Sequence, residues 1–105
     1  MSEPTWKIVS KIGEIASDDV ACVEIDGVKI AVVRTTDNQV FAIDSQCSHG
    51  RASLTDGYVD GLEIECPKHN GRFNVVTGEA VASPARMPLQ TYPCRITGEC
   101  VEIYY

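Results

Sequence analysis

The sequence predicts an all-β protein, an antiparallel β-sandwich or small barrel that carries two functional loops. Three observations lead to this fold class. Short apolar or alternating segments recur along all 105 residues, turn-forming residues separate them at close intervals, and no segment shows a convincing helical period. The longest uninterrupted apolar runs reach only four residues, as at 30–33. No segment is therefore long enough to predict a membrane-spanning helix.

Strands are expected where β-branched and aromatic residues cluster between turn signals. Asp26-Gly27 suits a two-residue type I′ turn and predicts a tight hairpin, and residues 97–99 predict another. Residues 12–15 have room for one helical turn at most. We expect strands at residues 6–9, 20–25, 28–34, 40–43, 62–66, 72–76, 89–96 and 100–105.

Length, charge and cysteine count limit the class of protein. A chain of 105 residues without repeats or a linker fits one domain, spanning 1–105. The net charge of −6 disfavours nucleic acid and anionic membranes as partners. Five cysteines are an odd count, and the first residues lack the apolar core of a secretory signal. Both observations favour a reducing cytoplasm over a disulfide framework.

Two short pairs contain the only two histidines of the chain. Cys47 precedes His49 by two positions, Cys66 precedes His69 by three, and residues 50–65 separate the pairs. Two thiolates and two imidazoles are a donor set for a soft or borderline metal. Both pairs fall in loops between expected strands, so we expect a metal site at the tips of two loops on a rigid sheet.

The donor set itself leaves two kinds of metal centre open. Zinc accepts two cysteines and two histidines in a tetrahedron, and zinc modules often take two ligands from each of two loops. A [2Fe–2S] cluster with mixed ligation takes two thiolates on one iron and two imidazoles on the other.

The residues around the two pairs favour the cluster. They read Cys-x-His-Gly, Leu-x-Asp-Gly-Tyr-x-x-Gly, Cys-Pro-x-His-x-Gly-x-Phe and Thr-Gly within residues 47–80. This segment closely resembles the cluster-binding segment of Rieske proteins. It most resembles the small soluble Rieske-type ferredoxins of bacterial aromatic-ring-hydroxylating dioxygenase systems, and the resemblance extends weakly over the flanking strands.

The resemblance implies a cofactor, ligands and partners. The cofactor is one [2Fe–2S] Rieske-type cluster, with Cys47 and Cys66 on one iron and His49 and His69 on the other. The protein is then no enzyme but a cytoplasmic, monomeric electron carrier. It takes one electron at a time from a flavin-containing reductase to a terminal oxygenase with Rieske and non-haem iron. The cluster-binding subdomain covers about 44–80, and the other strands form the base.

The docking surface is expected at the loop end of the molecule, where the ligand histidines have basic neighbours. These neighbours are Arg51, Lys68 and Arg86. No histidine remains after His49 and His69 to build the mononuclear iron site of an oxygenase, so the chain is not the oxygenase itself. The alternatives are a Rieske ferredoxin that serves a di-iron aromatic mono-oxygenase and a zinc-stabilised interaction module without a redox role.

We expect a low reduction potential within the Rieske range. In the resembling high-potential proteins of respiratory complexes, a disulfide joins the two loops and a serine follows the second histidine by two positions. The corresponding residues here are Ala52, Lys68 and Gly71. Because hydrogen bonds to the sulfurs raise the potential, their loss lowers it.

Several residues near the pairs have expected supporting roles. Phe73 and Tyr58 are expected to pack beneath the cluster, and Pro84 to shield it from one side. Gly61 and Gly78 are expected to be ordinary turn glycines. The three remaining cysteines lie in expected strands and are interpreted as small buried apolar residues. They are Cys22, Cys94 and Cys100.

Overall fold

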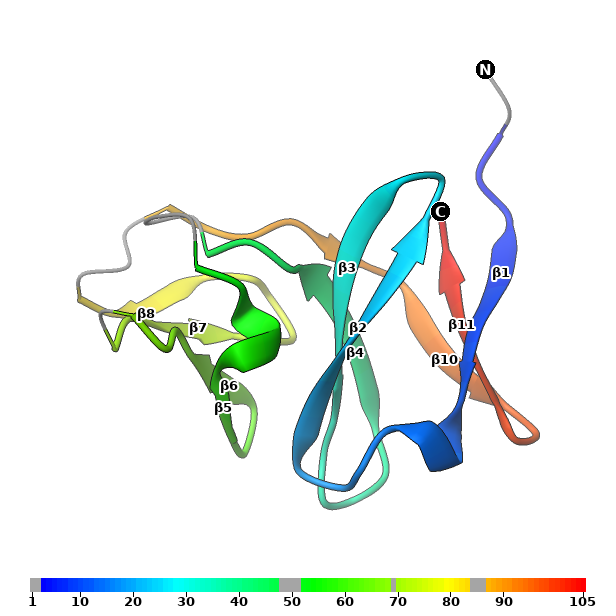
Figure 1. The fold of residues 1–105 in the computed structure, drawn as a ribbon, viewed down its shortest axis with the longest axis horizontal. Coiled ribbons are helices and arrows are strands. Elements are labelled where there is room, and N and C mark those ends of the chain that lie inside the picture. Colours follow the sequence, from blue (N-terminus) through cyan, green and yellow to red (C-terminus); the bar gives the residue numbers. More distant parts are fainter. Residues whose placement is uncertain (1–2, 48–51, 69, 84–86) are drawn as a thin grey trace.

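A computed structural model describes residues 3–47, 52–68, 70–83 and 87–105. Within these residues, strands form three antiparallel sheets, which confirms the all-β class. The third sheet stands apart on one side of the ribbon in Figure 1, while the other two lie together. The three sheets have the orders β1-β11-β10, β2-β3-β4-β9 and β5-β6-β7-β8.

The observed strands are short and their bounds differ slightly from the expected ones. The two helical segments of the described residues are single 3₁₀ turns, η1 (Ile12–Glu14) and η2 (Leu54–Asp56), and neither could cross a membrane. The strands are β1 (Trp6–Lys11), β2 (Asp19–Ile25), β3 (Val28–Arg34), β4 (Val40–Asp44), β5 (Tyr58–Asp60), β6 (Glu63–Glu65), β7 (Arg72–Asn74), β8 (Ala80–Ala82), β9 (Thr91–Tyr92), β10 (Cys94–Thr97) and β11 (Cys100–Tyr104).

Strand β3 is buried on both faces, which explains its continuous apolar run. Ile30 and Val32 belong to a core shared with strands of the first sheet. Ala31 and Val33 belong to a different core, shared with β6 and β7 of the third sheet. Because successive side chains of a strand point to opposite faces, the central sheet separates the two cores.

Both predicted hairpins are present. Ile25 and Val28 are register partners, and Asp26 and Gly27 between them have φ angles of 50° and 81°. Two positive φ angles define the type I′ turn that Asp-Gly predicts. In the last hairpin, Gly98 has a φ of 62° at the first position of the two-residue connection between β10 and β11.

The expectation of a single strand at 89–96 is wrong, because this segment contains two strands, β9 and β10. Strand β9 pairs with β4 in the second sheet, whereas β10 pairs with β11 in the first. Pro93 lies between them and has no N–H to donate to a ladder, so the chain changes sheets at this residue. Strands β5 and β8, three residues each, were not expected, because segments this short show little periodicity.

Candidate metal centre

The two candidate cysteine ligands lie in one buried cluster of the third sheet's core. Cys47 follows β4 by three residues and Cys66 directly follows β6. Each is only 2% exposed. Both belong to the core that also contains Leu54, Ile64 and Phe73. The fold therefore places two thiols that are 19 positions apart in the sequence in one buried core.

The first ligand loop, residues 48–51, is closed at its base by backbone hydrogen bonds. The N–H of Cys47 donates to the carbonyl oxygen of Ala52 at 2.9 Å. One step further out, Gln46 and Ser53 form an isolated antiparallel bridge. The Leu54 N–H donates to the Ser45 oxygen at 2.6 Å. This pairing fixes the backbone of Cys47.

The second ligand loop, residues 67–70, has a similar closed base. The N–H of Cys66 donates to the carbonyl oxygen of Gly71 at 2.7 Å, and the N–H of Asn70 donates back to the Cys66 oxygen at 3.1 Å. Glu65 and Arg72, one residue outside, are register partners of β6 and β7. Both cysteines therefore occupy equivalent positions, each at the start of a loop that a ladder hydrogen bond closes.

The described half of the donor set fits an iron–sulfur cluster. Thiolate sulfur is the ligand that iron–sulfur clusters require, and two buried thiols at the bases of two loops supply it. His49 and His69 lie outside the described residues. Within the described part of the chain, no group of three or more His, Cys, Asp or Glu residues suited to a metal is present.

An arginine not singled out by the sequence lies beside the second ligand loop. Arg72 contacts three carboxylates, at 3.1 Å from Glu65, 3.3 Å from Glu63 and 3.2 Å from Asp60. The hydrogen bond to Asp60, followed by those to Glu63 and Glu65, raises the pKa of Arg72 above its ordinary value. The alternating acidic residues of β6 were the sequence signal for this network.

The strand register places the two aromatic residues that were expected beneath the cluster on opposite faces of the third sheet. Phe73 is fully buried and shares the core with both cysteines. Tyr58 is 66% exposed, so the expectation that it packs beneath the cluster is wrong. Tyr58 is opposite Glu65, and Phe73 is opposite Ile64. Glu65 and Ile64 are successive residues and point to opposite faces of the sheet.

The remaining cysteines agree with the expectation only in part, since Cys94 packs against a core from strand β10. Cys22 is exposed on β2, so its interpretation as a buried apolar residue is wrong. Cys94 and Cys100 are half-buried. Burial raises the pKa of the Cys94 thiol to about 12, which outweighs a backbone hydrogen bond at Arg95 that lowers it.

Asp44 is a further residue that the sequence did not reveal. One of its carboxylate oxygens accepts from the N–H of Gln90 at 3.1 Å, and the other accepts from the Tyr92 hydroxyl at 2.8 Å. Its own N–H donates to the Gln90 oxygen at 3.0 Å. Asp44 therefore joins the end of β4, just before the first ligand loop, to a segment 46 positions away. No local pattern signals such a contact.

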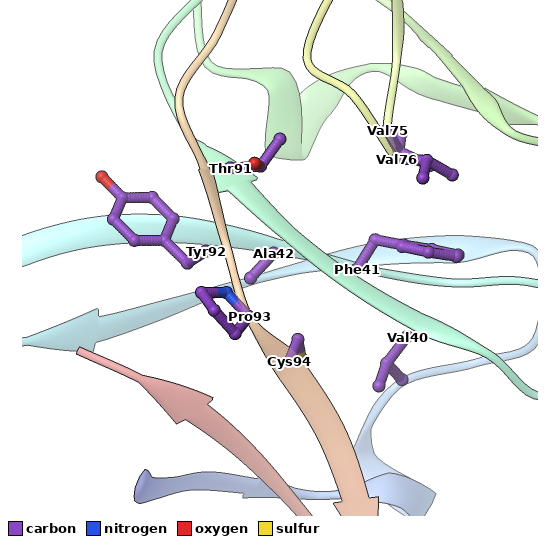
Figure 2. Close-up of a pocket in the computed structure, with 9 residues that line it drawn as sticks. All are labelled: Val40, Phe41, Ala42, Val75, Val76, Thr91, Tyr92, Pro93 and Cys94. Atoms are coloured by element: carbon purple, nitrogen blue, oxygen red, sulfur yellow. The ribbon is translucent and has the colours of Figure 1, made fainter. Parts of the chain in front are cut away.

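A separate cavity of about 330 Å³ lies where the second sheet meets the turn after β7. Figure 2 shows its lining side chains, among them Phe41 from β4, Cys94 from β10 and Val76 from the turn. Its walls are mainly apolar, and neither Cys47 nor Cys66 lines it. The cavity is therefore distinct from the candidate metal centre.

An all-β fold with two buried thiols at the bases of two loops fits an iron–sulfur protein. The family model for the Rieske [2Fe-2S] domain matches residues 5–93, and the chain belongs to this family. The chain is 39% identical to the ferredoxin component of the naphthalene 1,2-dioxygenase system of Pseudomonas aeruginosa, over 93% of both chains.

Solved structures agree with this assignment. The ferredoxin of carbazole 1,9a-dioxygenase from Nocardioides aromaticivorans IC177 is 34% identical, with a TM-score of 0.88 over 98% of both chains. A chain in the complex of reduced oxygenase and oxidized ferredoxin in carbazole 1,9a-dioxygenase is 35% identical. Its TM-score is 0.86, and the match covers 94% of this chain and 92% of that one.

Family membership decides between the two metal centres that the donor set left open. The cofactor is a Rieske-type [2Fe–2S] cluster and not a structural zinc ion. The protein is a Rieske ferredoxin, so its role is electron transfer and not catalysis on an organic substrate.

Proposed function

We propose that this protein carries single electrons from a flavin-containing reductase to the terminal oxygenase of a bacterial aromatic-ring-hydroxylating dioxygenase system, as a cytoplasmic monomer. One observation carries the proposal. A pair of buried thiols at the bases of two loops occurs in a chain that matches dioxygenase ferredoxins over nearly its full length. We place the parent dioxygenase system in a bacterial pathway that breaks down aromatic hydrocarbons.

In this proposal Cys47 and Cys66 hold one iron of the cluster, and His49 and His69 hold the other. The bound cluster supplies a one-electron acceptor whose mixed ligation raises its potential to between about −150 and +300 mV, against roughly −400 mV for plant-type ferredoxins. The chain's own part is to bury the two sulfur ligands and to fix their backbone. We place the cluster-binding subdomain at about 44–80 within a single domain, 1–105.

Docking is proposed at the loop end of the molecule. Of the basic residues expected there, Lys68 is described and is exposed, while Arg51 and Arg86 lie outside the described residues. The carbazole 1,9a-dioxygenase structure contains oxygenase and ferredoxin in one complex, which supports an oxygenase as one of the two partners. Each encounter transfers one electron, so weak and transient binding suffices.

The decisive experiment measures the cluster and then the transfer. Two irons, two sulfides and a Rieske-type EPR signal are expected in the dithionite-reduced protein, with a midpoint potential near the low end of the Rieske range. Cys47→Ser and Cys66→Ser are expected to abolish the signal, while Cys22→Ser, at an exposed thiol, leaves it unchanged. A colourless purified protein would contradict the ligation.

Transfer itself is then measured by mixing the reduced protein with the oxidised oxygenase component of a naphthalene-type dioxygenase. Oxidation of the ferredoxin in a stopped-flow trace, and product formation when a flavin-containing reductase and NADH are added, are the expected results. A protein with the EPR signal but without transfer to any ring-hydroxylating oxygenase would contradict the assigned partner and leave the cluster assignment intact.

A further inference from the structure

We propose that Arg72 is a positioning residue that keeps the second ligand loop closed and offsets the negative charge beside it, so that it raises the reduction potential. The proposal rests on the ligation by Cys66 proposed above. It concerns a residue that is no ligand and whose side chain lies on the outer face of the third sheet.

The first step is the position of Arg72 at the base of the loop. Glu65 and Arg72 are direct register partners, and the Cys66–Gly71 hydrogen bond lies immediately inside this pair. The Nε of Arg72 is 3.1 Å from a carboxylate oxygen of Glu65. A side-chain ion pair and a backbone hydrogen bond therefore close the same loop base.

The second step is the shortness of the strands that carry the loop. Strands β6 and β7 have three residues each. So few ladder hydrogen bonds oppose local opening only weakly, because a short ladder adds little cooperative stability. Side-chain contacts between β6 and β7 therefore supply a large share of the free energy that keeps the loop base closed.

The third step is the charge on the outer face. Asp60 and Glu63 are direct cross-strand partners, and Glu65 lies two positions along from Glu63 on the same face. Like charges placed directly opposite one another destabilise a sheet. The guanidinium of Arg72 contacts all three carboxylates at 3.1–3.3 Å and reduces this repulsion. The planar guanidinium group presents several N–H donors and can contact several carboxylates at once, whereas an ammonium group is less suited to this.

The consequence for electron transfer follows from the sign of the charge. Reduction adds one electron to a centre held by the loop next to Arg72. A nearby positive charge stabilises the reduced state, and three uncompensated carboxylates would destabilise it. Loss of Arg72 should therefore lower the midpoint potential, and it should also let the loop base open more often.

The test compares Arg72→Gln with Arg95→Gln, which changes the net charge equally. Arg95 is also part of an exposed ion pair, 2.8 Å from Glu102, but lies on the first sheet, on the other side of the molecule in Figure 1. In the full-length holoprotein, Arg72→Gln should lower the midpoint potential more than Arg95→Gln. It should also speed hydrogen exchange at the Cys66 and Asn70 amides about tenfold. Equal effects of the two variants would overturn the proposal.

Two further variants separate charge from geometry. Arg72→Lys keeps the positive charge and should restore the potential, while the two amides stay less protected than in the wild type because the fork is lost. The double variant Arg72→Gln with Glu63→Gln has the wild-type net charge, so its midpoint potential should return to the wild-type value. A potential that stays low in both would overturn the electrostatic part. Exchange of the Cys66 and Asn70 amides reads loop closure without reference to partners, so its outcome is separate from that of the transfer experiment.

Discussion

The N–H of Leu89 donates to the carbonyl oxygen of Gly78 at 2.7 Å, and this contact holds the turn after β7 against the segment that leads into β9. Gly78 has a φ of +79°, and a side-chain carbon added there would overlap the carbonyl oxygen of Leu89. The second ligand loop precedes β7, so the Gly78–Leu89 contact ties the sheet that carries this loop to the segment that joins the second sheet.

Replacement of Gly78 by alanine is expected to destabilise the protein by more than about 3 kcal/mol. The left-handed conformation costs a non-glycine residue roughly 1–2 kcal/mol, and displacement of the Leu89 backbone adds to this cost. Gly98→Ala is the matched control, because Gly98 has a φ of +62° but open space around it. Gly98→Ala should lose only the stability that corresponds to the cost of the left-handed conformation. Equal losses in urea unfolding of the two variants would show that the contact with Leu89 is unimportant.

Stability should fall as the pH rises from about 10 to about 12, partly through Tyr92. Burial of the ring, and secondly the hydrogen bond to Asp44, raise the pKa of Tyr92 to about 12. The unfolded chain releases this proton near its ordinary pKa of about 10. Between these values the folded state binds more protons than the unfolded state. The contribution is therefore complete below pH 10 and is lost toward pH 12.

The Tyr92→Phe variant tests this alkaline transition. Without the hydroxyl the variant should be about 1 kcal/mol less stable at pH 8, because it lacks the bond to Asp44. Its stability should then decline less steeply than that of the wild type between pH 10 and 12. Urea unfolding at a series of pH values gives both curves, and parallel curves would show that Tyr92 does not titrate in this window.

The thiols outside the candidate metal centre should differ in reactivity. Cys22 is exposed, whereas Cys94 is half-buried with a pKa of about 12. Only about one Cys94 thiol in ten thousand is then ionised at pH 8, and the thiolate is the reactive form. Iodoacetamide should label Cys22 first and Cys94 much later, as followed by mass spectrometry of peptides. Labelling of both at one rate would contradict the burial of Cys94.

Local signals predicted the parts of the fold that depend on local chemistry. Asp26-Gly27 specified its hairpin because both residues tolerate positive φ. Gly61 is an ordinary turn glycine in open space, as expected. Gly78 also lies in a turn, but its close approach to Leu89 joins residues from different elements, and no local pattern contains that contact.

The errors at Tyr58 and residues 89–96 have a common cause. Both depend on which strand pairs with which, and in what register. Tyr58 belongs to β5, whose pairing with β6 places it outward beside Glu65. The hydrophobic pattern shows no break around Pro93, yet the residues before and after it pair in two different sheets. The candidate cysteine ligands could be named from the sequence because their spacing and neighbouring residues are local, whereas the Arg72 and Asp44 contacts depend on tertiary structure.

Adjacent residues of β3 should separate the two cores experimentally. Val32 and Val33 are both fully buried, but Val32 packs in the core with Val101 and Ile103, and Val33 packs in the core with Cys47 and Cys66. Truncation of either to alanine removes two methyl groups and leaves a cavity, so each variant should lose about 2–3 kcal/mol.

Only Val33→Ala should accelerate loss of the cluster. The cavity it leaves lies in the core that contains both candidate cysteine ligands, and it lowers the cost of local opening there. The Val32→Ala cavity lies on the other face of the central sheet and lowers global stability alone. Bleaching of the visible absorbance in the presence of an iron chelator, measured well below the unfolding transition, gives the two rates. Equal bleaching rates at equal stability would mean that the two cores respond as one unit, because the central sheet would then transmit the strain across its thickness.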